Sequence, residues 1–401
     1  MIKIVIMQKN RKVIKYFFSS LIVVSCCILS FCKNHTENIE KEIQNDIRHG
    51  IVYFEEGHFA GWPANHGIWS WDNEILVGFV EASHEEKTGH TYDRSTARDK
   101  YARSRDGGLT WVIEDAYEKG QTGWRYNNQL PDDKAESPAD LEVSIDFEHP
   151  DLALTFLRAT NQTGPSHFYY SYDRGNSWNG PYEIPGFGTR GIITRTDYII
   201  DGKDELMAFL TVAKSDDREG RIINVRTIDG GINWEKVSWI GPEPERFDIM
   251  SSSVRLSDSD IITTIRTRKG DGQDLITSYY SEDNGDTWDQ LRAPVADTGR
   301  GGSPPALVKL NDGRLALGYI YRSQYGSRVN VRFSSDNGRT WSDEIVLRCG
   351  DGANRDVGYP RMVQRPDGKL VMIYYWNNVG QVGAKPYRYI ASTTFDPNNW
   401  K

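Results

Sequence analysis

Arginine, histidine and tyrosine are the residue types in this chain whose placement could do chemistry. Arginine binds a carboxylate through two parallel hydrogen bonds, and histidine and tyrosine take up or release protons. Residues of these types, with one asparagine, recur at short spacings in three parts of the chain, so they could bind an anion and move a proton beside it if the fold brings them together. The set comprises Asn65, His66, Arg190, Arg195, Tyr359 and Arg361.

The elements that would position these residues follow from one eight-residue pattern that occurs five times. Ser or Thr stands first, Asp third, Gly fifth and Trp eighth. The Asp can accept hydrogen bonds from backbone N–H groups two residues on, the Gly tolerates a positive φ, and the Trp ring packs on apolar surface beside the turn. Strand-like residues precede each copy, which predicts a hairpin turn at each. The copies span Ser104–Trp111, Ser171–Trp178, Thr227–Trp234, Ser281–Trp288 and Ser334–Trp341.

The copies recur every 53 to 67 residues, a period that suits a propeller blade of four strands. A second set of turns gives the number of blades, because each blade needs an inner hairpin as well. These turns fall at residues 72–73, 148–150, 201–202, 257–259, 312–313 and 367–368, and residues 396–400 resemble a degenerate sixth copy. The sequence therefore predicts an all-β, six-bladed propeller closed by a strand at residues 51–54, with seven blades as the alternative.

The same architecture predicts the rim of the substrate-binding face. The start of each inner strand, about six to eight residues before its hairpin, should lie at one end of the central channel. Loops that join second and third strands open at that end, among them residues 84–100 and the segment before Tyr169 and Tyr170. The rim positions obtained in this way are Asn65, His66, Asp140, Glu142, Arg190, Arg195, Ser252, Ser253, Pro304, Pro305, Tyr359 and Arg361.

Composition excludes some partners. Hydrophobic residues make up 38% and aromatic residues 12% of the chain, which is enough apolar mass for a packed core. The net charge of −8 disfavours nucleic acid and anionic membranes as partners, so an anion-binding site would need its positive charge concentrated locally. Three of the four cysteines precede residue 33, and Cys349 alone cannot build a disulfide framework.

The start of the chain has the features of an exported lipoprotein. Residues 1–15 are basic, and residues 16–31 form an apolar run too short for a comfortable membrane span. Leu29–Cys32 resembles a lipoprotein cleavage box, which makes Cys32 the expected lipidated residue in a signal peptide of residues 1–32. Cys26 follows a competing box, and an uncleaved signal anchor is the other alternative. We expect a tether at residues 33–49 and a single catalytic domain at residues 50–401, lipid-anchored in a bacterial envelope.

The repeated pattern resembles the Asp box of sialidase-like (BNR) β-propellers over about residues 50–401. Sialidases use three arginines around a carboxylate, a Tyr nucleophile with a Glu partner, and an Asp acid. The resemblance places that Tyr at Tyr359 and offers Asp93 as the acid. The Arg-Ile-Pro motif of the first sialidase blade is missing, because Gly61–Trp69 occupies its place, and this departure disfavours sialidase activity.

Gly61–Trp69, Ile145–Phe156 and Arg195–Ile200 are more similar to a uronate-active branch of these propellers. That branch includes ulvan lyases and enzymes that cut rhamnose–glucuronate linkages, and it works with His, Tyr and Arg. Together with the rim positions, the resemblance implies catalytic roles for His66, His90, Tyr170 and Tyr359. His84 is the alternative to His90, and Tyr169 is the alternative to Tyr170. It implies substrate-binding roles for Asn65, Arg190, Arg195 and Arg361.

The activity implied is β-elimination on uronic-acid (ulvan-like) oligosaccharides. Arg neutralises the carboxylate, His or Tyr removes the C5 proton, and a second such group protonates the leaving oxygen. Loss of a sugar would make the enzyme a lyase, and loss of a terminal hydroxyl would make it a dehydratase. The alternatives are glycoside hydrolysis, by an α-L-rhamnosidase or a divergent sialidase, and glycan binding without catalysis.

Each candidate also has a structural interpretation. His66 could bond a backbone carbonyl at a blade junction, Arg195 could form an ion pair, and Tyr359 could pack in the core. No cofactor is expected: His84, Glu85 and Glu86 lack the spacing of a metal site, although Ca²⁺ or Zn²⁺ stabilises related propellers. The expected partner is an anionic oligosaccharide, with membrane contact only through the lipid anchor and no nucleic acid.

Overall fold

The structure is a computed structural model that describes residues 47–123, 135–160, 162–378 and 387–400. The expected signal peptide, its lipidated Cys32 and all of the tether except residues 47–49 lie outside the described residues. Arg48 begins a compact unit that continues to the end of the chain, two residues before the expected start of the domain. In the part of the chain that is described, no helix is long and apolar enough to cross a lipid bilayer.

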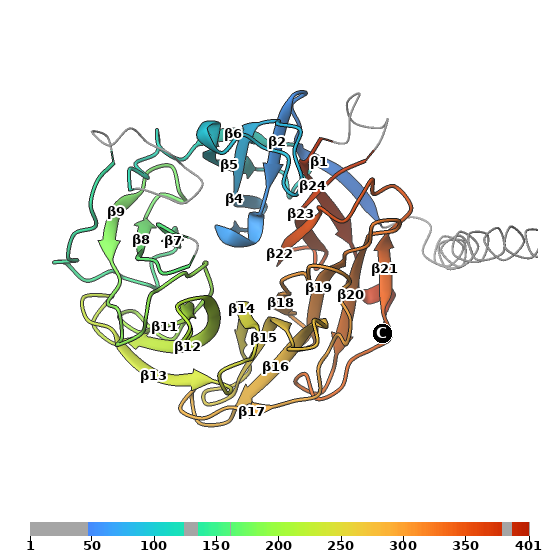
Figure 1. Ribbon diagram of the computed structural model, residues 1–401. Coiled ribbons are helices and arrows are strands. Elements are labelled where there is room, and N and C mark those ends of the chain that lie inside the picture. The colour runs from blue at the N-terminus through green and yellow to red at the C-terminus, as the bar shows by residue number, and fades with distance from the viewer. Residues whose placement is uncertain (1–46, 124–134, 161, 379–386, 401) are drawn as a thin grey trace, which may run out of the picture. The chain divides into compact units, whose positions relative to one another are not determined.

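Six sheets follow one another around a ring, which confirms the predicted six-bladed propeller (Figure 1). Blade 1 comprises β2 (His58–Gly61), β3 (Ile68–Trp71), β4 (Glu74–Ser83), β5 (Arg98–Ser104) and β6 (Val112–Asp115). Blade 2 comprises β7 (Ala153–Arg158), β8 (Ser166–Ser171) and β9 (Asn179–Glu183). Blade 3 comprises β10 (Tyr198–Ile200), β11 (Leu206–Ala213), β12 (Glu219–Thr227) and β13 (Glu235–Ile240). Blades 4 and 5 comprise β14 (Phe247–Arg255), β15 (Ile261–Arg268), β16 (Asp274–Ser281) and β17 (Asp289–Gln290); and β18 (Ala306–Lys309), β19 (Leu315–Tyr321), β20 (Arg328–Ser334) and β21 (Ile345–Arg348). Blade 6 comprises β22 (Gly358–Gln364), β23 (Leu370–Trp376), β24 (Tyr389–Phe395) and β1 (Arg48–Tyr53), and short 3-10 helices occur at η1 (Pro63–Asn65), η2 (Arg94–Thr96) and η3 (Pro397–Asn399).

The ring is closed by the first strand of the chain. β1 pairs antiparallel with β24, from Arg48 opposite Thr394 to Tyr53 opposite Ile390. Figure 1 shows this blue strand beside the red strands of blade 6. The predicted closing strand therefore exists, and it begins three residues earlier than expected.

Every Asp box forms the turn between the last two strands of its blade, and in every blade except the second these are the third and fourth strands, as predicted. In the first box the Asp106 carboxylate accepts hydrogen bonds from the N–H groups of Leu109 and Thr110 at 3.0 and 2.9 Å. These donors lie three and four residues on, rather than two. The Ser104 hydroxyl donates to Asp106 and accepts from the N–H of Gly108, each at 2.8 Å. The fixed residues thus satisfy the backbone of the turn from within.

The box tryptophans hold neighbouring blades together. The Trp178 ring, in blade 2, stacks on Tyr101 of blade 1 with ring centres 5.4 Å apart. Likewise, Trp234 of blade 3 contacts Phe156 of blade 2, and Trp288 of blade 4 contacts Phe209 of blade 3. The apolar surface that receives each of these rings belongs to the preceding blade, so the core of the protein lies between the blades.

Blade 2 departs from the prediction because, in the described residues, it has three strands and no inner strand before the hairpin at 148–150. The segment expected there bonds to blade 3 instead: the N–H of Ile145 donates to Gly230, and that of Phe147 donates to Lys203. The predicted rim residues Asp140 and Glu142 lie on this segment, exposed and just after the point where it bridges to the outer strand β9.

An Asp-box variant tests the role of the turn. The hydrogen bonds from Thr110, Ser104 and Leu109 lower the pKa of Asp106 to about 2, against a partial burial that would raise it. Because the folded pKa is depressed, this stabilisation is present above the ordinary carboxyl pKa of 3.8 and is lost as the pH falls towards 2. Asp106→Ala should lower the free energy of unfolding near pH 7 by about 1 kcal/mol. Urea denaturation measures this, with exposed Arg105→Ala as the control, and equal stabilities of the two variants would contradict it.

Candidate functional site

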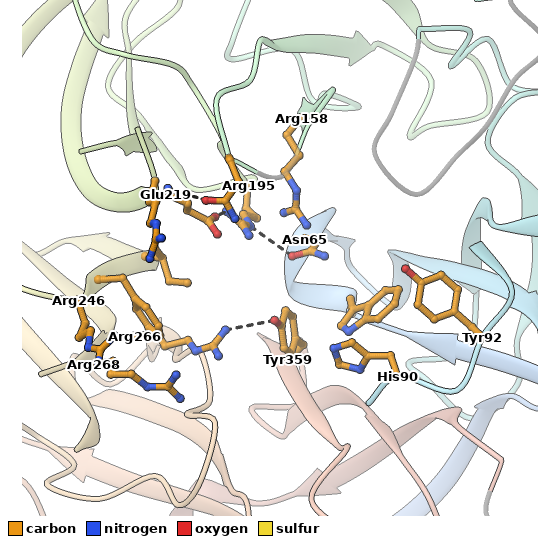
Figure 2. Close-up of a pocket in the computed structure, with 15 residues that line it drawn as sticks. Asn65, His90, Tyr92, Arg158, Arg195, Glu219, Arg246, Arg266, Arg268 and Tyr359 are labelled. Carbon is orange, nitrogen blue, oxygen red and sulfur yellow. Dashed lines mark hydrogen bonds and ion pairs between the residues drawn. The ribbon is translucent and has the colours of Figure 1, made fainter. Parts of the chain in front are cut away.

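A cavity of about 440 Å³ opens where the second strands of the blades end and the third strands begin (Figure 2). Six arginines and one carboxylate line it, so its charge is opposite to that of the chain as a whole. Aromatic rings and a histidine complete the wall. The residues concerned are Trp62, Asn65, His90, Tyr92, Arg158, Gln162, Arg195, Arg218, Glu219, Arg246, Phe247, Ile249, Arg266, Arg268 and Tyr359.

The strands explain why these side chains converge. Arg158 ends β7 and Arg268 ends β15, whereas Glu219 begins β12 and Tyr359 lies at the start of β22. Side chains two residues apart on a strand point to the same face, so Arg266 and Arg268 enter the cavity together. Strand ends and the adjoining loops thus supply arginines from three blades to one space.

The arginines differ in how they are held. Arg195 pairs with Glu219, and Arg268 forms two hydrogen bonds with Asp274 at 2.8 and 2.9 Å. Among the described residues, neither Arg246 nor Arg266 pairs with a carboxylate, so their charge is available to an anionic ligand. Guanidinium groups bind carboxylate, sulfate and phosphate oxygens in pairs, and such a cavity therefore selects anions.

Tyr359 lies half-buried among these cations. The Arg266 guanidinium donates to the Tyr359 hydroxyl at 3.2 Å and lies 5.6 Å from the centre of its ring. Burial alone would raise the pKa of Tyr359, but the positive charges of Arg266, Arg322 and Arg195 outweigh it and lower this pKa below the ordinary 10. A tyrosine in such a field can act as a base or nucleophile.

Backbone strain concentrates beside the cavity. Trp62, Met250 and Tyr359 have φ angles of 62°, 57° and 55°, the left-handed region that residues with a side chain seldom adopt. Trp62 and Tyr359 line the cavity, and the Met250 sulfur accepts a hydrogen bond from Arg266. Each such residue costs on the order of 1–3 kcal/mol, a cost typical of residues that a functional site requires in one orientation.

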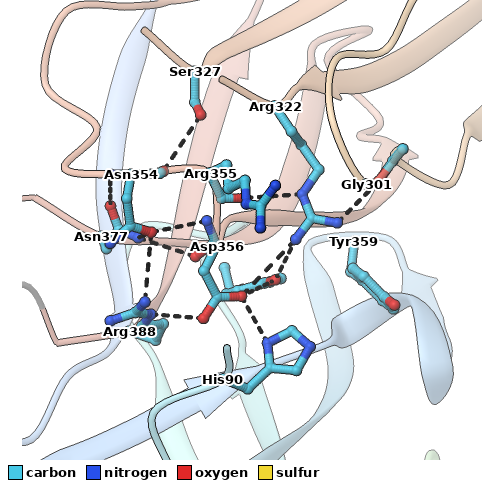
Figure 3. A network of polar contacts seen from close by, with 12 residues as sticks. His90, Gly301, Arg322, Ser327, Asn354, Arg355, Asp356, Tyr359, Asn377 and Arg388 are labelled. Carbon is cyan, nitrogen blue, oxygen red and sulfur yellow. Dashed lines mark hydrogen bonds and ion pairs between the residues drawn. The ribbon is translucent and has the colours of Figure 1, made fainter. Parts of the chain in front are cut away.

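A second group with acid–base capacity stands at the edge of the cavity (Figure 3). His90 Nδ1 lies 2.7 Å from Asp356 Oδ1, and its side chain is 44% exposed. Burial would raise the pKa of Asp356, but His90, Arg388 and Arg322 lower it far below its ordinary value, so this carboxylate is ionised. An ionised Asp356 makes Nδ1 the donor and leaves Nε2 as the nitrogen available for proton transfer.

The structure brings four of the sequence-predicted residues together. His90, Arg195, Asn65 and Tyr359 all line the cavity, and Arg195 Nε donates to Asn65 Oδ1 at 3.4 Å. Arg195 also forms an ion pair with Glu219, in agreement with its structural interpretation. The two functions are compatible, because one guanidinium can bond on several edges.

The other predicted residues do not line this cavity. His66 has no exposed surface and lies 2.9 Å from Asp99. Tyr170 stacks on Tyr182 outside the cavity, where burial and the neighbouring tyrosines raise its pKa to about 12. The exposed Arg190 pairs with Asp217.

Arg361 lies in the central channel, where it donates to the carbonyl oxygens of Ala64 and Thr196 at 2.7 and 2.5 Å. The alternatives fare similarly: His84 lies 3.1 Å from Glu86, and the Tyr169 hydroxyl bonds the backbone of Gly123. Asp93 is half-buried and caps the short helix η2. The described residues contain no group of three or more His, Cys, Asp or Glu side chains that could hold a metal ion.

Sequence reasoning missed most of the cationic wall, because it counted only from the inner hairpins. The missed residues stand where second strands end, where third strands begin, or just before an inner strand, and the first two kinds border the loops that were expected to open on this face. An arginine at such a position in an acidic chain is the signal that could have found them. The missed arginines are Arg158, Arg218, Arg246, Arg266 and Arg268, and the carboxylates Glu219, in the cavity, and Asp356, beside His90, were missed as well.

Many solved structures share this fold. A protein of unknown function from Dyadobacter fermentans superposes with a TM-score of 0.64 at 20% identity, covering 88% of this chain and 99% of that one. The NanB sialidase of Streptococcus pneumoniae gives 0.56 at 12% identity, covering 88% and 71%. The α-L-arabinofuranosidase Arb93A of Fusarium graminearum gives 0.52 at 12% identity, covering 86% and 98%. At these identities the likeness establishes the fold alone.

Sequence comparison identifies the family. No curated protein sequence matches the chain. The model of the BNR repeat-like domain matches residues 116–372, which is more than half of the chain and spans blades 2 to 5 and the start of blade 6. This agrees with the five Asp boxes and with the six-bladed ring, whereas the narrower resemblance to uronate-active propellers stays a prediction. The chain belongs to the BNR repeat-like domain family of β-propellers.

Proposed function

We propose that the protein is an enzyme that acts on uronic-acid oligosaccharides by β-elimination, with Tyr359 as the base and His90 as the acid. The observation that carries this proposal is the Tyr359 hydroxyl, whose pKa is lowered in a cavity lined by six arginines. A tyrosine packed only for stability would have no need of the Arg266 guanidinium, which pairs with no described carboxylate, beside its hydroxyl.

Substrate binding begins with the carboxylate of the sugar. Arg266 and Arg246 can bind its oxygens because no described carboxylate competes for them. Neutralising the carboxylate makes the proton on the adjacent C5 more acidic, since the negative charge that develops on proton removal is stabilised by the same guanidinium groups. Trp62 and Tyr92 offer apolar surface to the sugar ring.

Proton transfer then follows from the two acid–base groups. The Tyr359 phenolate takes the C5 proton, the C4–O bond breaks, and the electron pair forms a double bond between C4 and C5. The His90 imidazolium, held by Asp356, gives its proton to the leaving oxygen. Loss of a sugar at this step makes the reaction a lyase reaction, and loss of a terminal hydroxyl makes it a dehydration.

The arrangement favours elimination over hydrolysis because of where the single carboxylate of the cavity lies. A tyrosine nucleophile that attacks an anomeric carbon needs a carboxylate to activate it. Glu219 is engaged by Arg195, whereas Tyr359 is surrounded by cations. A cationic field favours loss of the Tyr359 proton without a partner base, and this suits proton removal from the substrate.

Glycoside hydrolysis is the second candidate. Its support is that solved structures with this fold are described as a sialidase and an α-L-arabinofuranosidase, and Tyr359 would then serve as the nucleophile. An α-L-rhamnosidase activity belongs to the same candidate. Export and lipid anchoring at Cys32 remain part of the proposal and rest on the sequence alone.

The product distinguishes the candidates. The purified protein should generate ultraviolet absorbance from a conjugated, unsaturated uronate when mixed with uronate–rhamnose oligosaccharides, and mass spectrometry should show either chain cleavage or the loss of one water. Shortened products without absorbance would overturn elimination and support hydrolysis. Binding without any product, measured by calorimetry, would leave a glycan-binding propeller.

A further inference from the structure

A second cationic cavity adjoins the first. It has a volume of about 630 Å³ and is lined by five arginines and a lysine, against two carboxylates. Both cavities fall within the range of about 300–1,000 Å³ that is usual for ligand sites. The charged residues of this second cavity are Glu86, Lys87, Arg268, Arg300, Arg322, Arg355, Asp356 and Arg388.

The two cavities meet at His90 and Arg268, which line both. His90 therefore has Tyr359 and the first cavity on one side and the second cavity on the other. A group that transfers a proton to a leaving oxygen must stand between the two parts that the reaction separates. The position of His90 thus divides the site into a reacting side and a leaving-group side.

Part of the second cavity is a fixed floor. The Arg322 guanidinium bonds the carbonyl oxygens of Arg355 and Gly302, each at 2.9 Å, and Arg388 bonds Asp356 at 2.9 Å (Figure 3). Both arginines are buried. Their bonds hold Asp356, and through it His90, in one place.

Of the remaining cations, Lys87 pairs with Glu85 and Arg268 with Asp274, whereas two arginines have no such partner. Arg300 is exposed and Arg355 is half-buried, and among the described residues neither side chain pairs with a carboxylate. Unneutralised like charges repel one another, so their gathering beside a reactive histidine disfavours the empty site and favours an anionic ligand.

We propose that the second cavity binds a second anionic group, a carboxylate or sulfate carried by the sugar next to the reacting one, through Arg300 and Arg355. This inference rests on the proposed function and deepens it: the substrate is an oligosaccharide with an acidic group on each side of the bond at His90. An oligosaccharide with an acidic group on the reacting sugar and a neutral neighbouring sugar would fill only the first cavity.

Three matched oligosaccharides test the inference. They share the reacting uronate, and the neighbouring sugar carries a carboxylate, a sulfate or neither. The wild-type protein should show a KM about tenfold lower for one or both of the dianionic substrates, and this preference should disappear in the double variant Arg300→Gln/Arg355→Gln. Arg105→Gln, an exposed arginine in an Asp-box turn, is the control and should keep the preference.

The outcomes separate this inference from the proposed function. Equal KM values for all three substrates, or a preference that survives the double variant, would overturn the second anion site while turnover upholds the enzyme. If no substrate is turned over, the proposed function fails, and calorimetric titration of the same oligosaccharides decides the site. Tighter binding of a dianionic oligosaccharide that is lost in the double variant would support it, and equal binding would overturn it.

Discussion

Tyr359→Phe should lower kcat by about a hundredfold to ten-thousandfold, because it removes the one hydroxyl that takes the substrate proton. The phenyl ring keeps its packing against Tyr375, at a ring-centre distance of 5.9 Å, so the fold should be unchanged. Substrate affinity should change little, since the arginines that bind the carboxylate remain. Steady-state kinetics of product absorbance measures kcat, and calorimetry measures binding.

Tyr170→Phe is the matched control, because the sequence assigned that residue a catalytic role and the structure places it outside the cavity. We expect its activity to stay within about twofold of the wild type, as for an ordinary surface substitution. Full activity in Tyr359→Phe would refute Tyr359 as the base. A large loss in Tyr170→Phe would restore the sequence-based assignment.

Arg266→Gln should lower kcat/KM by about two orders of magnitude and move the pH dependence of the reaction. The first effect follows from losing a buried guanidinium that binds substrate. The second follows because Arg266 is the foremost of the charges that lower the pKa of Tyr359. Activity rises with pH as Tyr359 loses its proton, so a raised pKa shifts this acidic limb to higher pH. The profile of kcat/KM against pH reports the shift.

Two variants keep this result interpretable. Arg266→Lys retains a positive charge and should shift the limb less than Arg266→Gln. Arg268→Gln removes another cation from the same cavity. Arg268 is hydrogen-bonded to Asp274 and makes no bond to Tyr359. This variant should weaken substrate binding and leave the acidic limb of the pH profile in place. If the acidic limb does not move in Arg266→Gln either, the ionisation of Tyr359 does not determine it.

The fold could be predicted because its signals are local. Each Asp box makes its turn-forming hydrogen bonds between residues at most four positions apart, as Asp106, Ser104 and Thr110 show. The turn can therefore be recognised from the box residues alone. Blade 2 could not be predicted in the same way. Its expected inner strand bonds to blade 3 through Ile145 and Phe147, and this competition between neighbouring sheets depends on contacts distant in sequence.

The site could be predicted only in part, because side-chain direction depends on register. Tyr359 and Arg361 stand two residues apart, and on a regular strand they would point to one face. The pairing of β22 shifts register between Gly358 and Arg361, and Tyr359 takes a positive φ. Tyr359 consequently enters the cavity while Arg361 enters the channel, an outcome that the alternation of residues does not reveal.

His66 illustrates a second limit. Its partner Asp99 lies 33 residues away on β5, so nothing near His66 in the sequence indicates that its ring contacts a buried carboxylate. His90 has the same kind of partner in Asp356, 266 residues away, yet it remains 44% exposed. Only the packing around each pair decides which histidine can meet a substrate.

The closing strand has a consequence for how the protein folds. β1 meets β24 across more than 300 residues, as the contact between His49 and Thr393 shows. Pairing over such a separation is slow, and until it happens β24 presents an unpaired edge to other chains. We therefore expect the first strand of the unit to complete the ring after the last blade has formed. A chain that lost residues 48–53 would keep every side chain of both cavities and would still be prone to aggregate through that edge.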